Sequence, residues 1–177
     1  MSRRYPFERK IADFEHATHE QVLDAAQNLL GQKPPYNLAA LRLLVSYFEP
    51  IGKYTEGFSR PGRSRHYFIK GCRDVIVRRT RNMRRLRPPT EVQLSGFYEI
   101  VRCGLAHGAT LSFNAAIGVG PYGLAISTDG AKISANPAEL LNVLRSDLDT
   151  YLAGLRNPRE HAVRAKFEAR WDYEAHL

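Results

Sequence analysis

The segment from residue 136 to residue 155 narrows the possible folds of this chain more than any other. Asn136 supplies a side-chain cap and Pro137 a first-turn proline, which together are typical of a helix start. The apolar residues that follow recur every three or four positions: Leu140, Leu141, Leu144, Leu148, Tyr151, Leu152 and Leu155. This stripe predicts a long helix with one face in the core of a helical protein.

Further start and stop signals predict helices on both sides of this segment. Thr18 with Gln21, and Thr90 with Gln93, have the spacing of a capping box, and Asn37 and Ser64 are capping residues. We predict helices over 18–30, 37–50, 64–78 and 90–107, and a last helix after 157–158.

Other segments lack helical spacing. Residues 1–17 are predicted to form an N-terminal arm with at most a short helix, and the glycines and prolines of 52–63 predict a loop. The Thr128-Asp129-Gly130 sequence between two alternating segments predicts a small β-hairpin. The expected fold is all-α: a bundle of five to six helices with a hairpin insertion. It divides into the arm, a helical domain over 18–156 and a C-terminal helix over 157–177.

The charge of the chain indicates its class of partner. A formal net charge of +8 favours a polyanion as the partner. Nucleic acid is favoured over a membrane, because no apolar run approaches the ~20 residues of a membrane span. The first residues carry positive charge without the apolar run of a signal peptide, so a cytoplasmic location is expected. The histidines and the two cysteines are scattered, so we expect no metal site and no cofactor.

An arginine cluster is the densest charged feature. Six of the ten residues from 78 to 87 are arginines: Arg78, Arg79, Arg81, Arg84, Arg85 and Arg87. Such a field suits RNA phosphates and a strongly salt-dependent affinity. The alternative is a solvated charged loop that keeps the protein soluble.

Arg102 and His107 close the predicted central helix and are the candidate catalytic residues. Arginine offers a planar fork of donors to a phosphate, and histidine exchanges a proton near neutral pH, so the pair needs no metal ion to act on a phosphodiester. Five residues correspond to about 140° on an ideal helix, so the two do not share one face. The alternative is two cations that stabilise a helix C-terminus.

Two residues before Arg102 are candidate supporting groups. Tyr98 and Glu99 precede it by four and three positions, so both are expected to reach its guanidinium. Glu99 either positions Arg102 or tunes His107; the alternative is an ordinary intrahelical ion pair. Cys103 is interpreted as a small core residue without a catalytic role.

Residues 98–108, with Arg and His five apart at the end of an apolar helix, resemble the core helix of the HEPN superfamily of all-α ribonucleases and nucleotide-binding proteins. Residues 47–54, 68–75 and 136–137 resemble its neighbouring helices, so the resemblance covers about 38–155. It implies that Arg102 binds the scissile phosphate and His107 is the general acid or base. It also implies a homodimer that completes the site. Cys103 departs from the pattern, because active members commonly carry Asn, Asp or His there.

The predicted function is therefore a metal-independent endoribonuclease, with RNA as substrate. A toxin or defence system is the expected setting, with an antitoxin or neighbouring regulatory protein as a partner. The alternative is a non-catalytic HEPN-like module that binds nucleotide, RNA or a protein. A purely structural dimerisation unit would leave the arginine cluster without a role.

Overall fold

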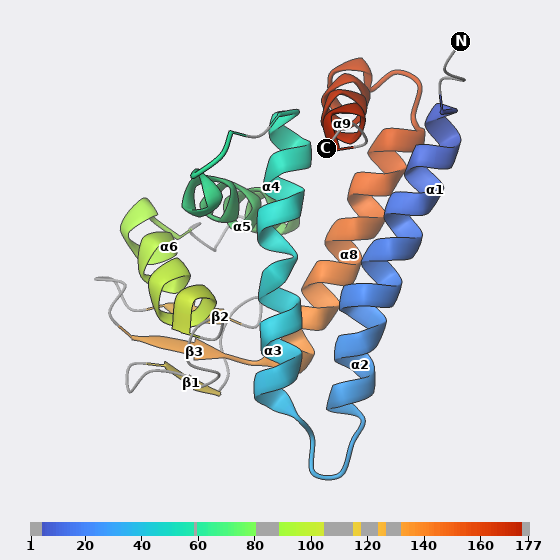
Figure 1. The fold of residues 1–177 in the computed structure, drawn as a ribbon. Coiled ribbons are helices and arrows are strands. Elements are labelled where there is room, and N and C mark those ends of the chain that lie inside the picture. The colour runs from blue at the N-terminus through green and yellow to red at the C-terminus, as the bar shows by residue number, and fades with distance from the viewer. Residues whose placement is uncertain are drawn as a thin grey trace.

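The computed structural model describes residues 5–58, 60–80, 89–104, 115–117, 124–126 and 132–174, of which 77, 79, 80, 115 and 124–126 are described by backbone alone. Figure 1 shows α8 (Pro137–Arg156) lying between a column of α1 and α2 and a column of α3 and α4. A small three-stranded sheet and α6 lie beyond α3. The predicted all-α class with a small β insertion is confirmed.

The first helical column begins earlier than predicted. Helix α1 (Phe7–Thr18) continues through the π-helical segment η1 (His19–Leu23) into α2 (Asp24–Leu30). The capping box at Thr18 is wrong, because Thr18 has helical backbone angles and its hydroxyl donates to the Phe14 carbonyl at 2.8 Å. Residues 7–17 thus belong to the bundle, where Ile11 and Phe14 are buried.

A buried lysine hid this helix from the sequence pattern. Lys10 is fully buried, and its ammonium group lies 2.5 Å from Asp172 and 3.3 Å from Glu168 on α9 (His161–Glu174). A charged residue on the inner face breaks the apolar stripe, although its aliphatic stem packs like an apolar side chain. The same contacts tie the last helix to the first, so α9 packs on the body of its own chain.

The second column is α3 (Asn37–Ser46) followed by α4 (Phe48–Glu56), with a break at Tyr47. The break lies one turn before Pro50, because proline has no N–H for the carbonyl of Ser46. The predicted loop over 52–63 is wrong for its first part. Helix α4 runs through Gly52 and ends at Gly57, whose φ of 92° is the left-handed conformation of a helix end.

Gly52 is instead the point where α4 crosses α5 (Ser64–Thr80). A Cβ added at Gly52 would lie 2.0 Å from the Tyr67 carbonyl oxygen, and one added at Gly71 would lie 1.9 Å from the Phe48 carbonyl oxygen. The two backbones are in contact, so neither position has room for a side chain. Beside this crossing the rings of Phe48 and Phe68 pack edge to face, 5.4 Å apart.

The central helix begins as predicted. Thr90 caps α6 (Glu91–Phe97) by accepting from the Gln93 N–H at 3.3 Å, while Gln93 Oε1 accepts from the Thr90 N–H at 2.9 Å. The helix continues as the π-helical segment η2 (Tyr98–Cys103), and its inner face is completed by the buried Val101. The predicted end at His107 lies outside the described residues.

The sheet confirms the predicted antiparallel pairing and adds a strand. Strand β2 (Leu124–Ile126) pairs with β3 (Ile133–Ala135), with Leu124 opposite Ala135. The Asp129-Gly130 turn lies outside the described residues. Strand β1 (Ala115–Ile117) pairs parallel to β3, which the sequence did not predict because a three-residue strand is too short to show alternation.

Helix α8 begins as the sequence predicts and carries the core. The Asn136 side chain accepts from the N–H groups of Ala138 and Glu139 at 3.1 and 3.3 Å. The predicted apolar stripe is buried along its whole length. Helix α9 begins at His161, later than predicted, because Asn157 caps a turn by accepting from the Arg159 N–H at 3.0 Å.

We expect Gly71→Ala to lower the free energy of unfolding by about 3 kcal/mol, because the new methyl group meets backbone atoms that cannot move aside. Urea unfolding followed by circular dichroism measures the change. Gly154→Ala is the matched control: it lies inside α8, where an added Cβ meets no atom within 4 Å. The control should gain about 0.5–1 kcal/mol from helix propensity. Equal effects of the two substitutions would contradict the close crossing.

Candidate functional site

Arg102 lies near the end of η2, partly exposed, with its guanidinium held from two sides. Its Nη2 lies 3.3 Å from Glu49 Oε2 on α4, and its Cζ lies 5.9 Å from the centre of the Tyr98 ring. Tyr98, a predicted supporting residue one turn earlier on the same helix, thus contacts the guanidinium through its ring. The π-helical backbone here is a feature that often accompanies functional sites.

Glu49 is the carboxylate that organises the surroundings of Arg102. It also contacts Lys53 Nζ at 2.7 Å and accepts a hydrogen bond from the Ser64 hydroxyl. Burial by itself raises the pKa of Glu49, but the hydrogen bonds from Lys53 and Ser64 and the charges of Lys53 and Arg102 outweigh burial and lower it. Glu49 is therefore ionised at neutral pH and fixes the direction of Arg102.

A cavity of about 310 Å³ opens beside this ion pair. Arg42, Glu49 and Lys53 from the second helical column line it, together with Phe68 of α5 and Arg102. The described lining therefore contains three cations and one carboxylate, an excess of positive charge. A cavity of this charge and size suits a phosphate group.

The other predicted supporting residue has a different partner. Glu99 pairs with Arg65 of α5 at 3.7 Å, and more than half of each side chain is exposed. An exposed pair of this kind contributes little to stability. Sequence reasoning chose Glu99 over Glu49 because Glu99 is close to Arg102 in the chain, whereas Glu49 is 53 residues away.

The arginine cluster is described only at its first member. Arg78 forms a bidentate pair with Asp147 of α8, with Nε 2.5 Å from Oδ1 and Nη2 3.0 Å from Oδ2. Tyr47 donates to the same carboxylate at 2.8 Å, and Asp147 is only 5% exposed. Burial, followed by the nearby Asp147, raises the pKa of Tyr47, so its hydroxyl stays a donor. The charge of Arg78 is therefore balanced inside the bundle.

His107, Arg81, Arg84, Arg85 and Arg87 lie outside the described residues, and Arg79 is described by its backbone alone.

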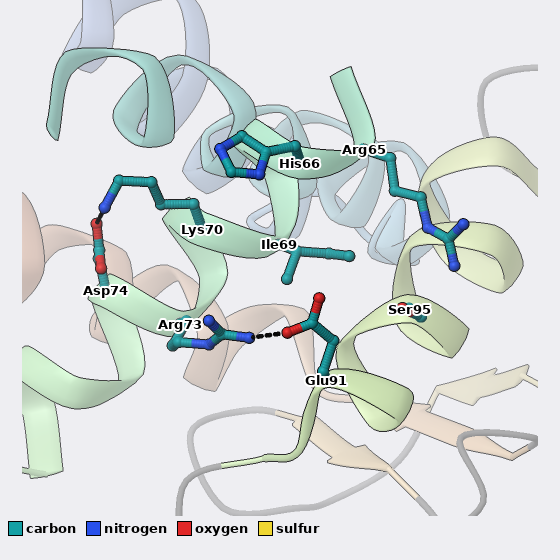
Figure 2. Close-up of a pocket in the computed structure, with 8 residues that line it drawn as sticks. All are labelled: Arg65, His66, Ile69, Lys70, Arg73, Asp74, Glu91 and Ser95. Carbon is teal, nitrogen blue, oxygen red and sulfur yellow. Dashed lines mark hydrogen bonds and ion pairs between the residues drawn. The ribbon is translucent and has the colours of Figure 1, made fainter. Parts of the chain in front are cut away.

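A groove of about 600 Å³ runs between α5 and α6 (Figure 2). Its cations are matched by acids: Arg73 lies 2.8 Å from Glu91, and Lys70 lies 2.9 Å from Asp74. Figure 2 shows both pairs, with Arg65 at the far end of the groove. A phosphate backbone would have to break these ion pairs to bind. The Arg102 cavity, with its excess of positive charge, is the better anion site.

Within the described part of the chain, no three His, Cys, Asp or Glu side chains gather closely enough to bind a metal ion. No helix among the described residues is long and apolar enough to cross a membrane. Both cysteines are free thiols: Cys72 is buried, which raises its pKa, and Cys103 is partly buried on η2.

Comparison of the chain with protein-family models, curated proteins and solved structures gives no match. The resemblance to HEPN proteins therefore stays a prediction, and the function is argued from the site.

Because the pKa of Glu49 is lowered, the contribution of Glu49 to the stability of the protein should depend on pH. The stabilisation from its ionised form is complete above the ordinary pKa of 4.5 and is lost as the pH falls through the lowered value. Glu49→Gln should therefore lose stability relative to the wild type at neutral pH, and the difference should shrink as the pH falls below 4.5. Urea unfolding at a series of pH values measures it. Glu160→Gln, at an exposed position before α9, is the control. A difference that does not vary with pH would contradict the assignment.

Proposed function

We propose that this protein is a metal-independent endoribonuclease in which Arg102 binds the scissile phosphate. The observation that carries the proposal is the position of Arg102 in a cavity with Arg42 and Lys53. Among the described residues, three cations from three different helices line this cavity together with one carboxylate. The net charge of +8 supports a polyanionic substrate such as RNA.

The contacts of Arg102 suit a phosphate-binding role. Glu49 engages only its Nη2 among the described residues, so other N–H groups of the planar fork are available to a phosphate. The Tyr98 ring limits the rotation of the guanidinium. Glu49 therefore orients the arginine without using its whole donor set, and Lys53 offsets the charge of Glu49.

His107 is proposed as the general acid or base. It follows Gly104, the last described residue of the central helix, by three positions. In the proposed reaction it removes the proton from a ribose 2′-hydroxyl, whose oxygen attacks the adjacent phosphorus and displaces the 5′-oxygen of the next nucleotide. The proton that His107 takes up goes on to this 5′-oxygen, which leaves as a hydroxyl group, and His107 returns to its starting state. The product is a 2′,3′-cyclic phosphate. A homodimer that completes the site, and control by an antitoxin or neighbouring regulatory protein, belong to the same proposal.

A second candidate is a module that binds RNA or nucleotide without cleaving it. One observation favours it: the described lining of the Arg102 cavity contains phosphate-binding cations but no histidine. Such a module needs only the charge of the cavity and of the arginine cluster. It would keep RNA affinity when His107 is changed and lose affinity when Arg84 and Arg85 are neutralised.

Incubation with end-labelled single-stranded RNA and excess EDTA tests the proposal. The wild type should give fragments that end in 2′,3′-cyclic phosphate. His107→Ala and Arg102→Ala should each reduce the rate by about 100-fold or more, because one removes the proton-transfer group and the other a phosphate contact. Arg145→Gln is the matched control: it removes one charge from α8, where Arg145 pairs with Asp24.

Circular dichroism confirms that each variant is folded. If the wild type and all variants leave the RNA intact, and His107→Ala still binds RNA, the ribonuclease proposal is wrong and the binding module is favoured. Cleavage that persists in both site variants would assign the activity to other residues.

A further inference from the structure

The connection between α4 and α5 presents an aromatic ring to solvent. Phe58, the residue after the glycine that ends α4, is 44% exposed. The other phenylalanines that the structure describes are buried or pack against the core. An aromatic ring held outside the core is free to stack on a flat ring of a ligand. Nothing in the ribonuclease proposal uses Phe58.

The backbone on both sides of Phe58 is held by the body of the protein. On one side, Gly57 packs so closely against α9 that an added Cβ would lie 3.0 Å from the Lys166 Cα. Figure 1 shows α9 beside this end of α4. On the other side, the Arg60 N–H donates to the hydroxyl of the fully buried Tyr67 at 2.8 Å. A connection that is already held in place loses less entropy when a ligand binds to it.

Positive charge lies close to this ring. The Arg60 Cζ is 5.6 Å from the centre of the Phe58 ring. Arg60 and Arg63 make no ion pair with any residue that the structure describes. Glu56, the acid nearest to Phe58 in the chain, lies 2.9 Å from His66 Nε2. Surfaces that bind single-stranded nucleic acid combine the same two groups, because aromatic rings stack on bases and cations contact the backbone.

The same connection leads to the Arg102 cavity. Ser64, at the start of α5, donates to Glu49, the carboxylate that orients Arg102. On α4, Gly57 follows Glu49 by eight residues, which corresponds to about 12 Å along the helix axis. Stacked nucleotides are spaced by about 3.4 Å, so a strand with one phosphate at Arg102 reaches Phe58 within about four nucleotides.

We propose that Phe58 is a stacking platform for an unpaired base of the RNA, and that Arg60 and Arg63 bind the neighbouring phosphates. This inference rests on the proposed function, because it takes RNA as the ligand, and it narrows the substrate to single strands. A base inside a duplex is already stacked on both faces and has no free face for the ring. Every base has a face that can stack, so the contact gives affinity for single strands without a preference for sequence.

Fluorescence anisotropy with a labelled 2′-O-methyl oligoadenylate of about eight nucleotides tests the platform. The methyl group blocks the 2′-oxygen that the proposed reaction needs, so binding is measured without cleavage. Phe58→Ala should weaken binding by about tenfold, whereas Phe58→Tyr, which keeps the ring, should bind like the wild type. A blunt RNA duplex should bind equally to the wild type and to Phe58→Ala. Tyr36→Ala is the matched control and should bind unchanged, because it removes a ring that is 57% exposed between α2 and α3.

Phe58→Trp reports the stacking directly. The chain has one tryptophan, Trp171, whose ring lies 6.0 Å from that of the buried Phe167. The difference in fluorescence between Phe58→Trp and the wild type therefore belongs to the new indole. This fluorescence should fall when the oligoadenylate binds, because the indole then stacks on a base.

Several results would overturn the platform. They are equal affinity of the wild type and Phe58→Ala, equal losses in Phe58→Ala and Tyr36→Ala, and an unchanged fluorescence of Phe58→Trp on binding. A loss of duplex binding in Phe58→Ala as large as the loss for the single strand would also do so, as would no binding to the wild type below a Kd of about 1 mM. The two proposals fail separately. Stacking without RNA cleavage contradicts only the ribonuclease, whereas cleavage without stacking contradicts only the platform.

Discussion

The backbone contact between Gly52 and Gly71 is the constraint on which the rest of the structure depends. It lets α4 and α5 cross without intervening side chains. At this distance polar groups on the two helices reach each other directly: Ser64 bonds to Glu49 on one side of the crossing, and Thr55 bonds to Asp74 on the other. The Arg102 cavity includes the first of these carboxylates. A wider crossing would separate the pairs and leave each carboxylate without its hydroxyl donor from the other helix.

Buried charges add a second constraint, because they restrict which helices can pack side by side. The carboxylate of Asp147 accepts from Arg78 on α5 and from Tyr47 at the break between α3 and α4, and Lys10 pairs with acids on α9. Burying such groups is expensive, and removing one partner leaves the other desolvated and unpaired. Two helices in apolar contact can slide past each other, whereas a hydrogen-bonded ion pair forms at only one relative position of its two helices. They therefore contribute to a unique arrangement more than to stability.

The sequence predicted those elements whose signals are local. Asn136 and Thr90 cap their helices because a cap needs only three residues, and the leucine stripe defines the buried face of α8. The sequence did not predict features that depend on residues far away along the chain. Gly52 indicates a turn in sequence, but it is required by a helix 19 positions away at Gly71. Glu49 contacts Arg102 across 53 positions, a distance that no spacing rule covers.

The winding of the π-helical segment η2 sets the direction of the Arg102 side chain. A π-helical turn contains an extra residue compared with an α-helical turn, so the chain after it is rotated relative to a regular helix. Regular winding over one residue fewer gives nearly the same total rotation, so deleting one residue inside Tyr98–Cys103 would leave the direction of the helix after this segment nearly unchanged. The side chains inside the segment, Arg102 among them, would change direction instead, because each residue of the wide turn advances by a smaller angle than the ~100° of an α-helix. The extra residue therefore sets the direction of Arg102 while the face of the helix that packs on the core keeps its place.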